Sequence, residues 1–266
     1  MDFLEAVILA IIQGLTEWLP VSSEGISSLV MINFFGKSLA EAIFVSVWLH
    51  AGTLLAATLY FWSDIKNILR GLPSYIRNPN QKEGYPGLTR FLVISTLTTA
   101  IVAVPLVLFM LESFEFSGGA AMGLIGILLI ATGVMQKSIK HSQIISERPG
   151  FSDAVIAGIA QAFSVFPGLS RSGLTTSVLL LRKHDPEYAL KLSFLMSIPA
   201  VFMAEIALIA TGNNIFMFDF FSIVAVSVSF LLGLLTLGSL LKIAQKVNFG
   251  YFCIFLGVLS LLAVFM

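Results

Sequence analysis

The sequence has little charge and almost no cysteine. Only 11% of its 266 residues are charged, whereas 57% are hydrophobic, and the mean hydropathy is +0.95. Soluble domains carry roughly a quarter charged residues, so this composition excludes an ordinary soluble domain and predicts a polytopic membrane protein. The single cysteine, Cys253, can form no internal disulfide and supplies no cysteine-rich metal site. It is expected to be a small buried side chain.

Neither sign of charge is in excess. Lys and Arg number 15, as do Asp and Glu, so the net charge is zero and nothing indicates nucleic acid as a partner. Asp2 and Glu5 stand where a secretory signal would have basic residues, so we expect no cleavable signal peptide. The partner that composition predicts is the lipid bilayer, and the sequence leaves a homodimer open.

Long apolar segments predict six membrane-spanning helices. A spanning helix needs roughly 20 apolar residues, and the segments of suitable length are 40–62, 91–111, 118–136, 187–211, 220–241 and 249–266. The five glycines at 118, 119, 123, 126 and 133 are expected to be close-packing points between helices. The segment 63–90 is polar and rich in turn-forming residues, and is predicted to be a loop.

Four shorter apolar pieces form two pairs, 3–19 with 26–35 and 153–164 with 173–181. None is long enough to span, so each pair is predicted to be a re-entrant helix–loop–helix that enters the membrane and returns. Thirteen of the 15 Lys and Arg residues fall on one side of this layout, which is therefore expected to be cytoplasmic. Six spans then place both termini outside, and the tips of the two re-entrant pairs can meet near the midplane.

An internal repeat supports this layout. Residues 5–13, Glu-Ala-Val-Ile-Leu-Ala-Ile-Ile-Gln, match residues 153–161, Asp-Ala-Val-Ile-Ala-Gly-Ile-Ala-Gln, at an offset of 148. At the same offset Ser22 matches Ser170 and Gly25 matches Gly173, and Ser46 matches Ser193 at 147. Three spans between the copies invert the second one. We predict a single membrane domain, 1–266, in which an inverted-topology repeat of about 1–136 and about 152–266 is joined by a cytoplasmic loop of about 137–151.

Arg171 and Glu17 are charged side chains that this layout places inside the membrane, where an ionisable group is costly. Arginine suits the forked recognition of phosphate, and a helix that begins near Gly173 would add its backbone amides. A packing anchor between Glu17 and Arg171, and a simple helix cap, remain open alternatives. The predicted phosphate-binding residues are Gln13, Ser22, Ser23, Ser170, Arg171, Ser172, Gly173, Thr175 and Thr176.

Only oxygen ligands are available near Glu17, so the predicted cofactor is a divalent cation, Mg²⁺ or Ca²⁺. Its predicted ligands are Gln13 and Glu17, which share a helix face, together with Glu24. Glu24 is alternatively a base or a residue at the water edge. His50 lies well inside a predicted span and is interpreted either as a proton carrier or as a satisfied core group. The predicted catalytic residues are Glu17, Ser23, Glu24, His50, Ser170 and Arg171.

Three stretches resemble the undecaprenyl-diphosphate phosphatase family, also called the bacitracin-resistance family. Residues 13–25, Gln-Gly-Leu-Thr-Glu-Trp-Leu-Pro-Val-Ser-Ser-Glu-Gly, resemble its first signature, and 167–173, Pro-Gly-Leu-Ser-Arg-Ser-Gly, followed by Thr175, resemble its second. His50-Ala-Gly-Thr53 resembles a third stretch. The resemblance covers essentially the whole chain. It implies a metal-dependent membrane hydrolase that converts a C55-type polyprenyl diphosphate to the monophosphate lipid carrier and inorganic phosphate, with an active site open to the outer face of the cell membrane.

By motif position, the resemblance makes Glu17 the essential acid, Arg171 the phosphate-binding arginine, and Ser23 and Ser170 the signature serines. The residue after Gly25 is usually histidine in the family, but here it is Ile26. The general base is therefore open between Glu24 and His50, and the attacking group is open between a serine and water. Broken helices in an inverted repeat also suit a transporter or flippase for a polyprenyl phosphate lipid, which is the alternative function.

Overall fold

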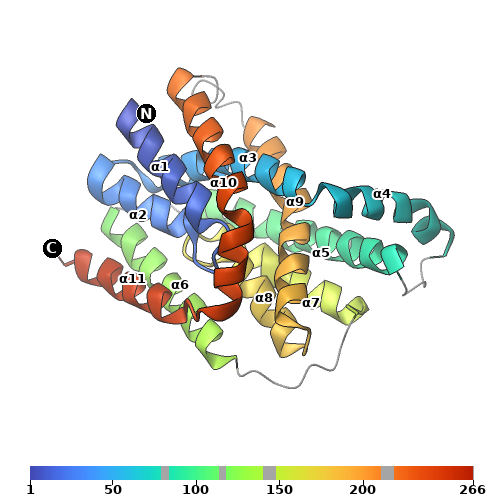
Figure 1. Ribbon diagram of the computed structural model, residues 1–266. Helices are drawn as coiled ribbons and strands as arrows, with labels where there is room; N and C mark the ends of the chain where they lie inside the picture. Colours follow the sequence, from blue (N-terminus) through green and yellow to red (C-terminus); the bar gives the residue numbers. More distant parts are fainter. Residues whose placement is uncertain (79–83, 114–117, 140–147, 211–218, 266) are drawn as a thin grey trace.

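The computed structural model describes residues 1–78, 84–113, 118–139, 148–210 and 219–265, and the regular elements of these segments are all helices. In chain order they are α1 (Phe3–Thr16), α2 (Ser23–Phe35), α3 (Leu39–Tyr60), α4 (Trp62–Arg77), α5 (Gly84–Ser113), α6 (Gly118–Ser138), α7 (Phe151–Ala162), the 3₁₀ turn η1 (Phe163–Val165), α8 (Arg171–Leu181), α9 (Pro186–Ala210), α10 (Phe220–Lys246) and α11 (Gly250–Ala263). Figure 1 shows both chain ends on one side of the bundle, with α4 on the opposite side.

Five of the described helices are long and apolar enough to cross a membrane, namely α3, α5, α6, α9 and α10. They confirm the prediction of an all-helical polytopic membrane protein. The sixth predicted span, 249–266, is shorter than expected because α11 ends at Ala263 and has only 14 residues. At about 1.5 Å per residue it is about 21 Å long, whereas the hydrocarbon core is about 30 Å thick.

The prediction of a loop over 63–90 is wrong, because α4 occupies Trp62–Arg77 and α5 begins at Gly84. Ile65 and Ile68, three residues apart, pack against the core from one face of α4. Gly71 continues that face, and a Cβ added there would lie 2.7 Å from Thr89 Oγ1 of α5. Asp64, Lys66, Arg70, Pro73 and Arg77 thus lie along an amphipathic surface helix, Pro86 and Arg90 lie on α5, and Pro79 and Lys82 lie outside the described residues.

The predicted short pairs are helical hairpins, α1–α2 and α7–α8, and their connections meet in the middle of the molecule (Figure 1). Their second helices begin alike. The Ser22 hydroxyl accepts a hydrogen bond from the Gly25 amide at 3.0 Å, and the Ser170 hydroxyl accepts one from the Gly173 amide at 3.1 Å. Each serine therefore caps its helix, at the positions that the sequence repeat matches.

The two connections are joined directly to each other. The Gly168 amide donates to Ser22 Oγ at 3.0 Å, and Ser170 Oγ donates to the Val21 carbonyl at 3.0 Å. Gly168 has a φ of +105°, a backbone conformation that favours glycine. A Cβ added at Gly25 would lie 2.9 Å from the Gly168 backbone, so glycine is needed on both sides of this junction. The expected meeting of the two tips is therefore present.

Gly126 and Gly133 are the points at which α6 touches the backbone of α11. A Cβ added at Gly126 would lie 2.8 Å from the Gly257 carbonyl oxygen, and one added at Gly133 would lie 2.4 Å from the Gly250 carbonyl oxygen. These contacts confirm two of the predicted close-packing glycines. The prediction is wrong for the other three, where the nearest atom among the described residues would be a side-chain atom at 3.7 Å or more: Gly118, Gly119 and Gly123.

We expect Gly133→Ala to destabilise the protein by about 1–3 kcal/mol, because the added methyl group meets backbone atoms rather than a movable side chain. Thermal unfolding of the purified protein in detergent measures the effect. The matched control is Gly123→Ala on the same helix, where the nearest atom is Val264 Cγ2 at 3.8 Å. Alanine's higher helix propensity is expected to keep its Tm at or above the wild-type value. Equal Tm values for both variants would contradict close packing at Gly133.

Asp153 holds the start of α7 to the end of α8. Its carboxylate accepts from the Gly150 amide at 2.7 Å and from Arg182 Nε at 2.6 Å, and lies 3.3 Å from His184 Nε2. Burial raises the pKa of Asp153, but these hydrogen bonds and the charges of Arg182 and His184 outweigh it, so the pKa lies below its ordinary value of 3.8. The stabilisation is therefore present above pH 3.8 and is lost as the pH falls below it.

Candidate active site

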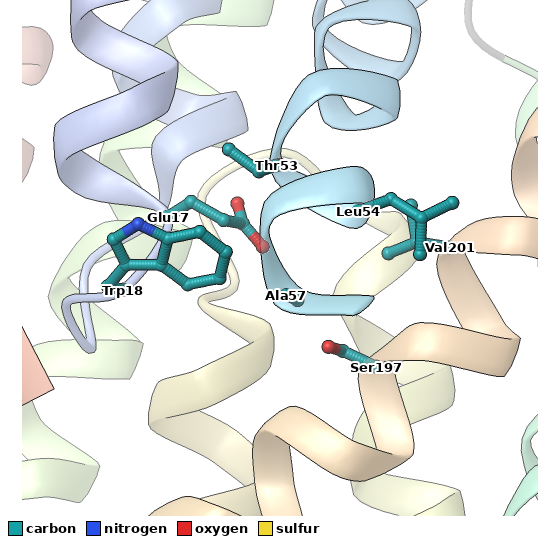
Figure 2. A pocket seen from close by; sticks show the side chains of 7 residues that line it. All are labelled: Glu17, Trp18, Thr53, Leu54, Ala57, Ser197 and Val201. Atoms are coloured by element: carbon teal, nitrogen blue, oxygen red, sulfur yellow. The ribbon is translucent and has the colours of Figure 1, made fainter. Parts of the chain in front are cut away.

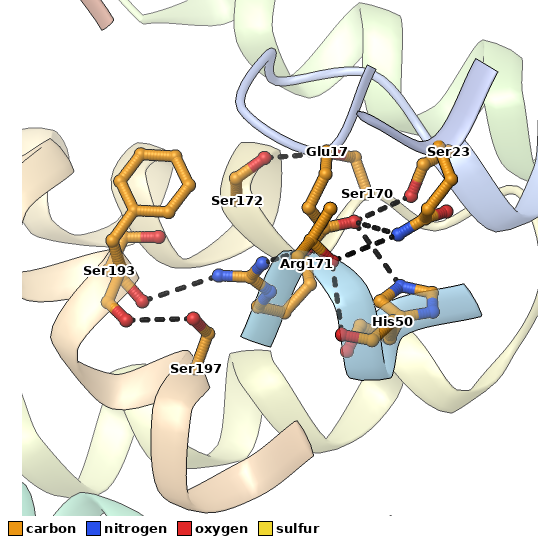
Figure 3. A network of polar contacts seen from close by, with 12 residues as sticks. Glu17, Ser23, His50, Ser170, Arg171, Ser172, Ser193 and Ser197 are labelled. Atoms are coloured by element: carbon orange, nitrogen blue, oxygen red, sulfur yellow. Dashed lines mark hydrogen bonds and ion pairs between the residues drawn. The ribbon is translucent and has the colours of Figure 1, made fainter. Parts of the chain in front are cut away.

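Glu17, at the end of α1, is the centre of the site. Its side chain is 6% exposed and is surrounded by hydrogen-bond donors (Figure 3). Oε2 accepts from Ser23 Oγ at 2.8 Å and from Gln13 Nε2 at 3.1 Å, and Oε1 is bound by Arg171. His50 Nε2 lies 3.2 Å from Oε2. The hydrogen bonds and the ion pair from these donors offset the hydration that the carboxylate loses on burial.

Arg171 is the first residue of α8 and connects the two hairpins. One terminal nitrogen binds Glu17 of the first hairpin, and the other donates to the Ser193 carbonyl of α9 at 3.4 Å. The guanidinium lies 5.6 Å from the centre of the Phe194 ring. Two directed donors on one planar group are what distinguish arginine from lysine. The contact with Glu17 agrees with the alternative of a packing anchor as well as with a phosphate-binding role.

His50 extends from α3 toward Glu17. Its Nδ1 lies 2.6 Å from the Ser46 carbonyl oxygen, and because a carbonyl only accepts, Nδ1 carries a hydrogen. Nε2 faces a carboxylate oxygen, so this contact is attractive only with a second hydrogen between the two groups. His50 and Glu17 therefore hold a proton between them, which suits the interpretation of His50 as a proton carrier.

Of the four predicted serines, Ser23 is the one whose hydroxyl points at Glu17. The other three form the junction between the hairpins. Ser170 Oγ donates to a backbone carbonyl of the first connection at 3.0 Å, and Ser172 Oγ donates to another at 2.9 Å. Ser22 Oγ accepts two backbone amides. The hydroxyls of Ser22, Ser170 and Ser172 are thus already engaged with backbone.

The remaining predicted site residues differ in whether their polar atoms have hydrogen-bond partners. Thr175 Oγ1 donates to the Arg171 carbonyl at 2.8 Å, and the Gly173 amide is taken by the helix cap. Gln13 Oε1 and Thr176 Oγ1 are buried without a hydrogen-bond partner among the described residues. Glu24, in the first turn of α2, makes no hydrogen bond or ion pair within that part of the chain, although the charges of His50 and Glu17 act on it.

A small cavity with room for about one water molecule lies beside Glu17, between α3 and α9. Figure 2 shows the Glu17 carboxylate pointing toward it, with Leu54 and Val201 together on the side away from Trp18. One end of the cavity is therefore polar and the other is apolar. Its lining residues are Glu17, Trp18, Thr53, Leu54, Ala57, Ser197 and Val201.

Several site residues lie outside the sequence prediction. The sequence pairs Ser46 with Ser193 only as repeat positions, yet each supplies a backbone carbonyl to a site side chain, to His50 and to Arg171 respectively. Glu205 of α9 is a further carboxyl group with both oxygens buried. Its signal in the sequence is that it lies in the interior of the predicted span 187–211, far from the other acid at its first position, Glu187, and an ionisable residue there marks a functional candidate.

The fold and the site define a class: a polytopic membrane protein whose interior holds a carboxylate in contact with both an arginine and a serine. A serine beside a base and an arginine for anionic oxygens are the groups that phosphoryl-transfer chemistry uses. The chain belongs to the bacitracin resistance protein BacA family, whose model matches residues 6–262. This confirms the family that the signature stretches indicate.

Relatives from several organisms match the chain over its full length. A protein of Methanococcoides burtonii is 52% identical over 262 residues, which cover 98% of each chain. One from Methanothrix thermoacetophila is 39% identical over 98% of this chain and 96% of its own. One from Desulforapulum autotrophicum is 31% identical over 100% and 99%. All three are named undecaprenyl-diphosphatase.

Proposed function

We propose that this protein is an integral-membrane phosphatase that hydrolyses a polyprenyl diphosphate of the undecaprenyl type to the monophosphate lipid carrier and inorganic phosphate. The observation that carries the proposal is the contact of Ser23 with Glu17 beside Arg171, in a chain of the BacA family. The names of the relatives favour the phosphatase over the transporter or flippase. The substrate reaches the site from the bilayer that the long apolar helices require.

Ser23 is the proposed nucleophile, since its hydroxyl donates to Glu17 at 2.8 Å as a nucleophile donates to its base. In the first step the Ser23 oxygen bonds to the terminal phosphorus and the bond from that phosphorus to the bridging oxygen breaks. The hydroxyl proton passes through Glu17 to the departing monophosphate. In the second step water attacks the phosphoserine, a water proton passes through Glu17 to the Ser23 oxygen, and inorganic phosphate leaves.

Arg171 is proposed to bind the terminal phosphate and to stabilise the charge on its oxygens during transfer. Its two terminal nitrogens now bind the Glu17 carboxylate and the Ser193 carbonyl, and a phosphate can replace either acceptor. Release of Glu17 from Arg171 would leave the carboxylate as the proton acceptor for Ser23. Arg171 and Glu17 would then be paired with each other without substrate, and would separate to act on the phosphate and on Ser23 when substrate binds.

A divalent cation, Mg²⁺ or Ca²⁺, is the proposed cofactor. No group of three or more His, Cys, Asp or Glu residues in the described segments could hold a metal alone. Gln13 Oε1 and the Glu24 carboxylate keep oxygens free of hydrogen bonds there, whereas both Glu17 oxygens are taken by donors. Mg²⁺ is commonly held by one or two protein groups together with substrate phosphates. Gln13 and Glu24 fit such a shared cation, which would neutralise charge on the diphosphate.

We further propose a place in the cell membrane with both termini and the active site facing outside, because this puts most Lys and Arg on the cytoplasmic side. Six spans would require α11 to cross with local thinning of the bilayer. An inverted repeat over 1–136 and 152–266 is supported by matched glutamines. Gln13 Nε2 lies 3.4 Å from Thr53 Oγ1 of α3, and Gln161 Nε2 lies 3.4 Å from the Met196 carbonyl oxygen of α9, the two helices that carry the matched serines Ser46 and Ser193.

Purified protein in detergent is expected to release inorganic phosphate from a C55 polyprenyl diphosphate when Mg²⁺ or Ca²⁺ is present. EDTA is expected to stop the release, and added cation to restore it. Acid quenching with substrate labelled in the terminal phosphate, followed by peptide mapping, is expected to find phosphoserine at Ser23. Absence of release would contradict the phosphatase, release in EDTA would contradict the cation, and a fully active Ser23→Ala would contradict the nucleophile.

A further inference from the structure

Glu205 is a carboxyl group of α9 that the proposed reaction does not use. It is 7% exposed, and neither of its oxygens has a hydrogen-bond partner of normal geometry among the described residues, although the Ala51 backbone amide lies near enough to act on it. An ionised carboxylate without a partner is very costly inside a membrane, so the neutral carboxylic acid is the stable form here. A neutral carboxyl group carries one O–H donor. A buried donor without an acceptor can bind a ligand that brings the acceptor.

Glu205 lies on the seam between α3 and α9, next to the cavity beside Glu17. Ser197, Val201 and Glu205 are four residues apart and therefore share one face of α9. The first two line the cavity opposite α3 (Figure 2). Glu205 stands one turn beyond Val201, and its neighbours across the seam are His50 and the backbone of α3 at Ala51. Glu205 thus lies one turn of α9 beyond the lining of the cavity, on the same face of the helix.

The seam combines two polar groups, Glu17 and Glu205, with apolar side chains beside them, as the two phosphates and the isoprenoid tail of the proposed substrate require. It starts at Glu17, where the terminal phosphate reacts, and passes between Leu54 and Val201. Large apolar side chains flank the seam on the outside of the bundle and are more than half exposed: Leu55 and Leu59 of α3, and Phe202 and Ile206 of α9. A diphosphate head at Glu17 with an isoprenoid tail between these helices would bring the lipid-side phosphate toward Glu205.

We propose that Glu205 donates a hydrogen bond from its neutral carboxyl group to the lipid-side phosphate, and that the isoprenoid tail leaves the site between α3 and α9. This inference rests on the proposed phosphatase function and adds a substrate-binding residue to it. Arg171 then holds the phosphate that is transferred, while Glu205 holds the phosphate that stays with the lipid. The guanidinium group of Arg171 is a charged donor to the transferred phosphate, and the carboxyl group of Glu205 is a neutral donor to the lipid-side phosphate.

Inhibition by the two products separates these phosphates. Glu205→Leu removes the donor, and we expect it to raise the KM for C55 diphosphate and the Ki for C55 monophosphate about tenfold. The Ki for inorganic phosphate is expected to stay unchanged. Glu205→Gln keeps a donor without a charge, and is expected to keep all three constants within about threefold of wild type.

A glutamine variant as impaired as the leucine variant would contradict the neutral donor, since only the ionisable group would then serve. Equal shifts in both product Ki values, or none in Glu205→Leu, would contradict a bond to the lipid-side phosphate. Thermal unfolding checks the fold, and leucine at this buried position is not expected to lower Tm. A wild-type protein that releases no phosphate would instead contradict the proposed function, so the two failures are distinguishable.

Two further variants test whether the isoprenoid tail leaves the site between α3 and α9. Val201→Trp fills the seam, and we expect it to lower kcat/KM for C55 diphosphate by more than about tenfold, because the overpacked seam no longer opens for the tail. Leu231→Trp is the control, because Leu231 belongs to α10, outside the seam, and is 54% exposed. Its kcat/KM is expected to stay at the wild-type value. Equal losses in the two variants would contradict the route.

Discussion

Replacing Arg171 with lysine is expected to lower kcat/KM for the polyprenyl diphosphate at least about a hundredfold, as measured by steady-state phosphate release. Lysine keeps the charge, but one ammonium group does not reproduce a planar fork that reaches both Glu17 and the Ser193 carbonyl. Arg171→Ala is expected to cost more, because Glu17 also loses its buried counter-charge. That loss is expected to remove about 3–5 kcal/mol of stability and to lower Tm.

Arg182→Lys is the matched control for Arg171→Lys. Arg182 stands at the other end of α8, and its Nε binds Asp153 at 2.6 Å, away from the site. Its substitution is expected to lower Tm slightly and to leave kcat/KM unchanged. An Arg171→Lys protein within tenfold of wild type would contradict the need for a fork. A comparable loss of activity in Arg182→Lys would show that disturbance of α8, rather than of the phosphate site, reduces the rate.

The sequence predicts the hairpins and the charged centre of the site because both depend on local features. Apolar pieces too short to span, each followed by serine and glycine, predict α1–α2 and α7–α8. Glu17 and Arg171 stand out because little else in those pieces is charged. Which hydroxyl faces Glu17 is not readable in this way, because Ser22 and Ser23 are adjacent. The rotation of α2 against α1 decides it, making Ser22 the cap and Ser23 the partner of Glu17.

Features that depend on the neighbouring helix are the ones that the sequence does not predict. The glycines of α6 look alike in the sequence, but Gly126 and Gly133 pack closely only because the backbone of α11 crosses α6 there. The carbonyl of Ser193 becomes a partner of Arg171 through the position of α9. The sequence does not indicate α4, because charged residues and Pro73 interrupt it and few of its side chains, such as Ile65 and Ile68, pack against the core. Each case depends on tertiary packing rather than on composition.

Replacing Glu17 with glutamine is expected to lower kcat about a thousandfold, the usual range for a missing general base. Glutamine keeps the shape of the side chain, but its amide cannot take a proton from Ser23. Its NH₂ group would also face at least one of the donors that now surround the carboxylate. Rapid-quench measurement of phosphoserine formation from labelled substrate tests this directly, because the first chemical step is expected to be the one that slows.

The double variant Glu17→Gln/Ser23→Ala distinguishes a base from an anchor. If Glu17 acts through Ser23, the double variant is expected to be no slower than the slower single variant, because residues that act as a unit are not additive. Glu5→Gln is the matched control, being the same substitution on the same helix at an acid that pairs with Lys37 at 3.7 Å. It is expected to keep the wild-type rate. A Glu17→Gln protein that forms phosphoserine at the wild-type rate would contradict Glu17 as the base for the attack and direct attention to His50, which contacts the same carboxylate oxygen.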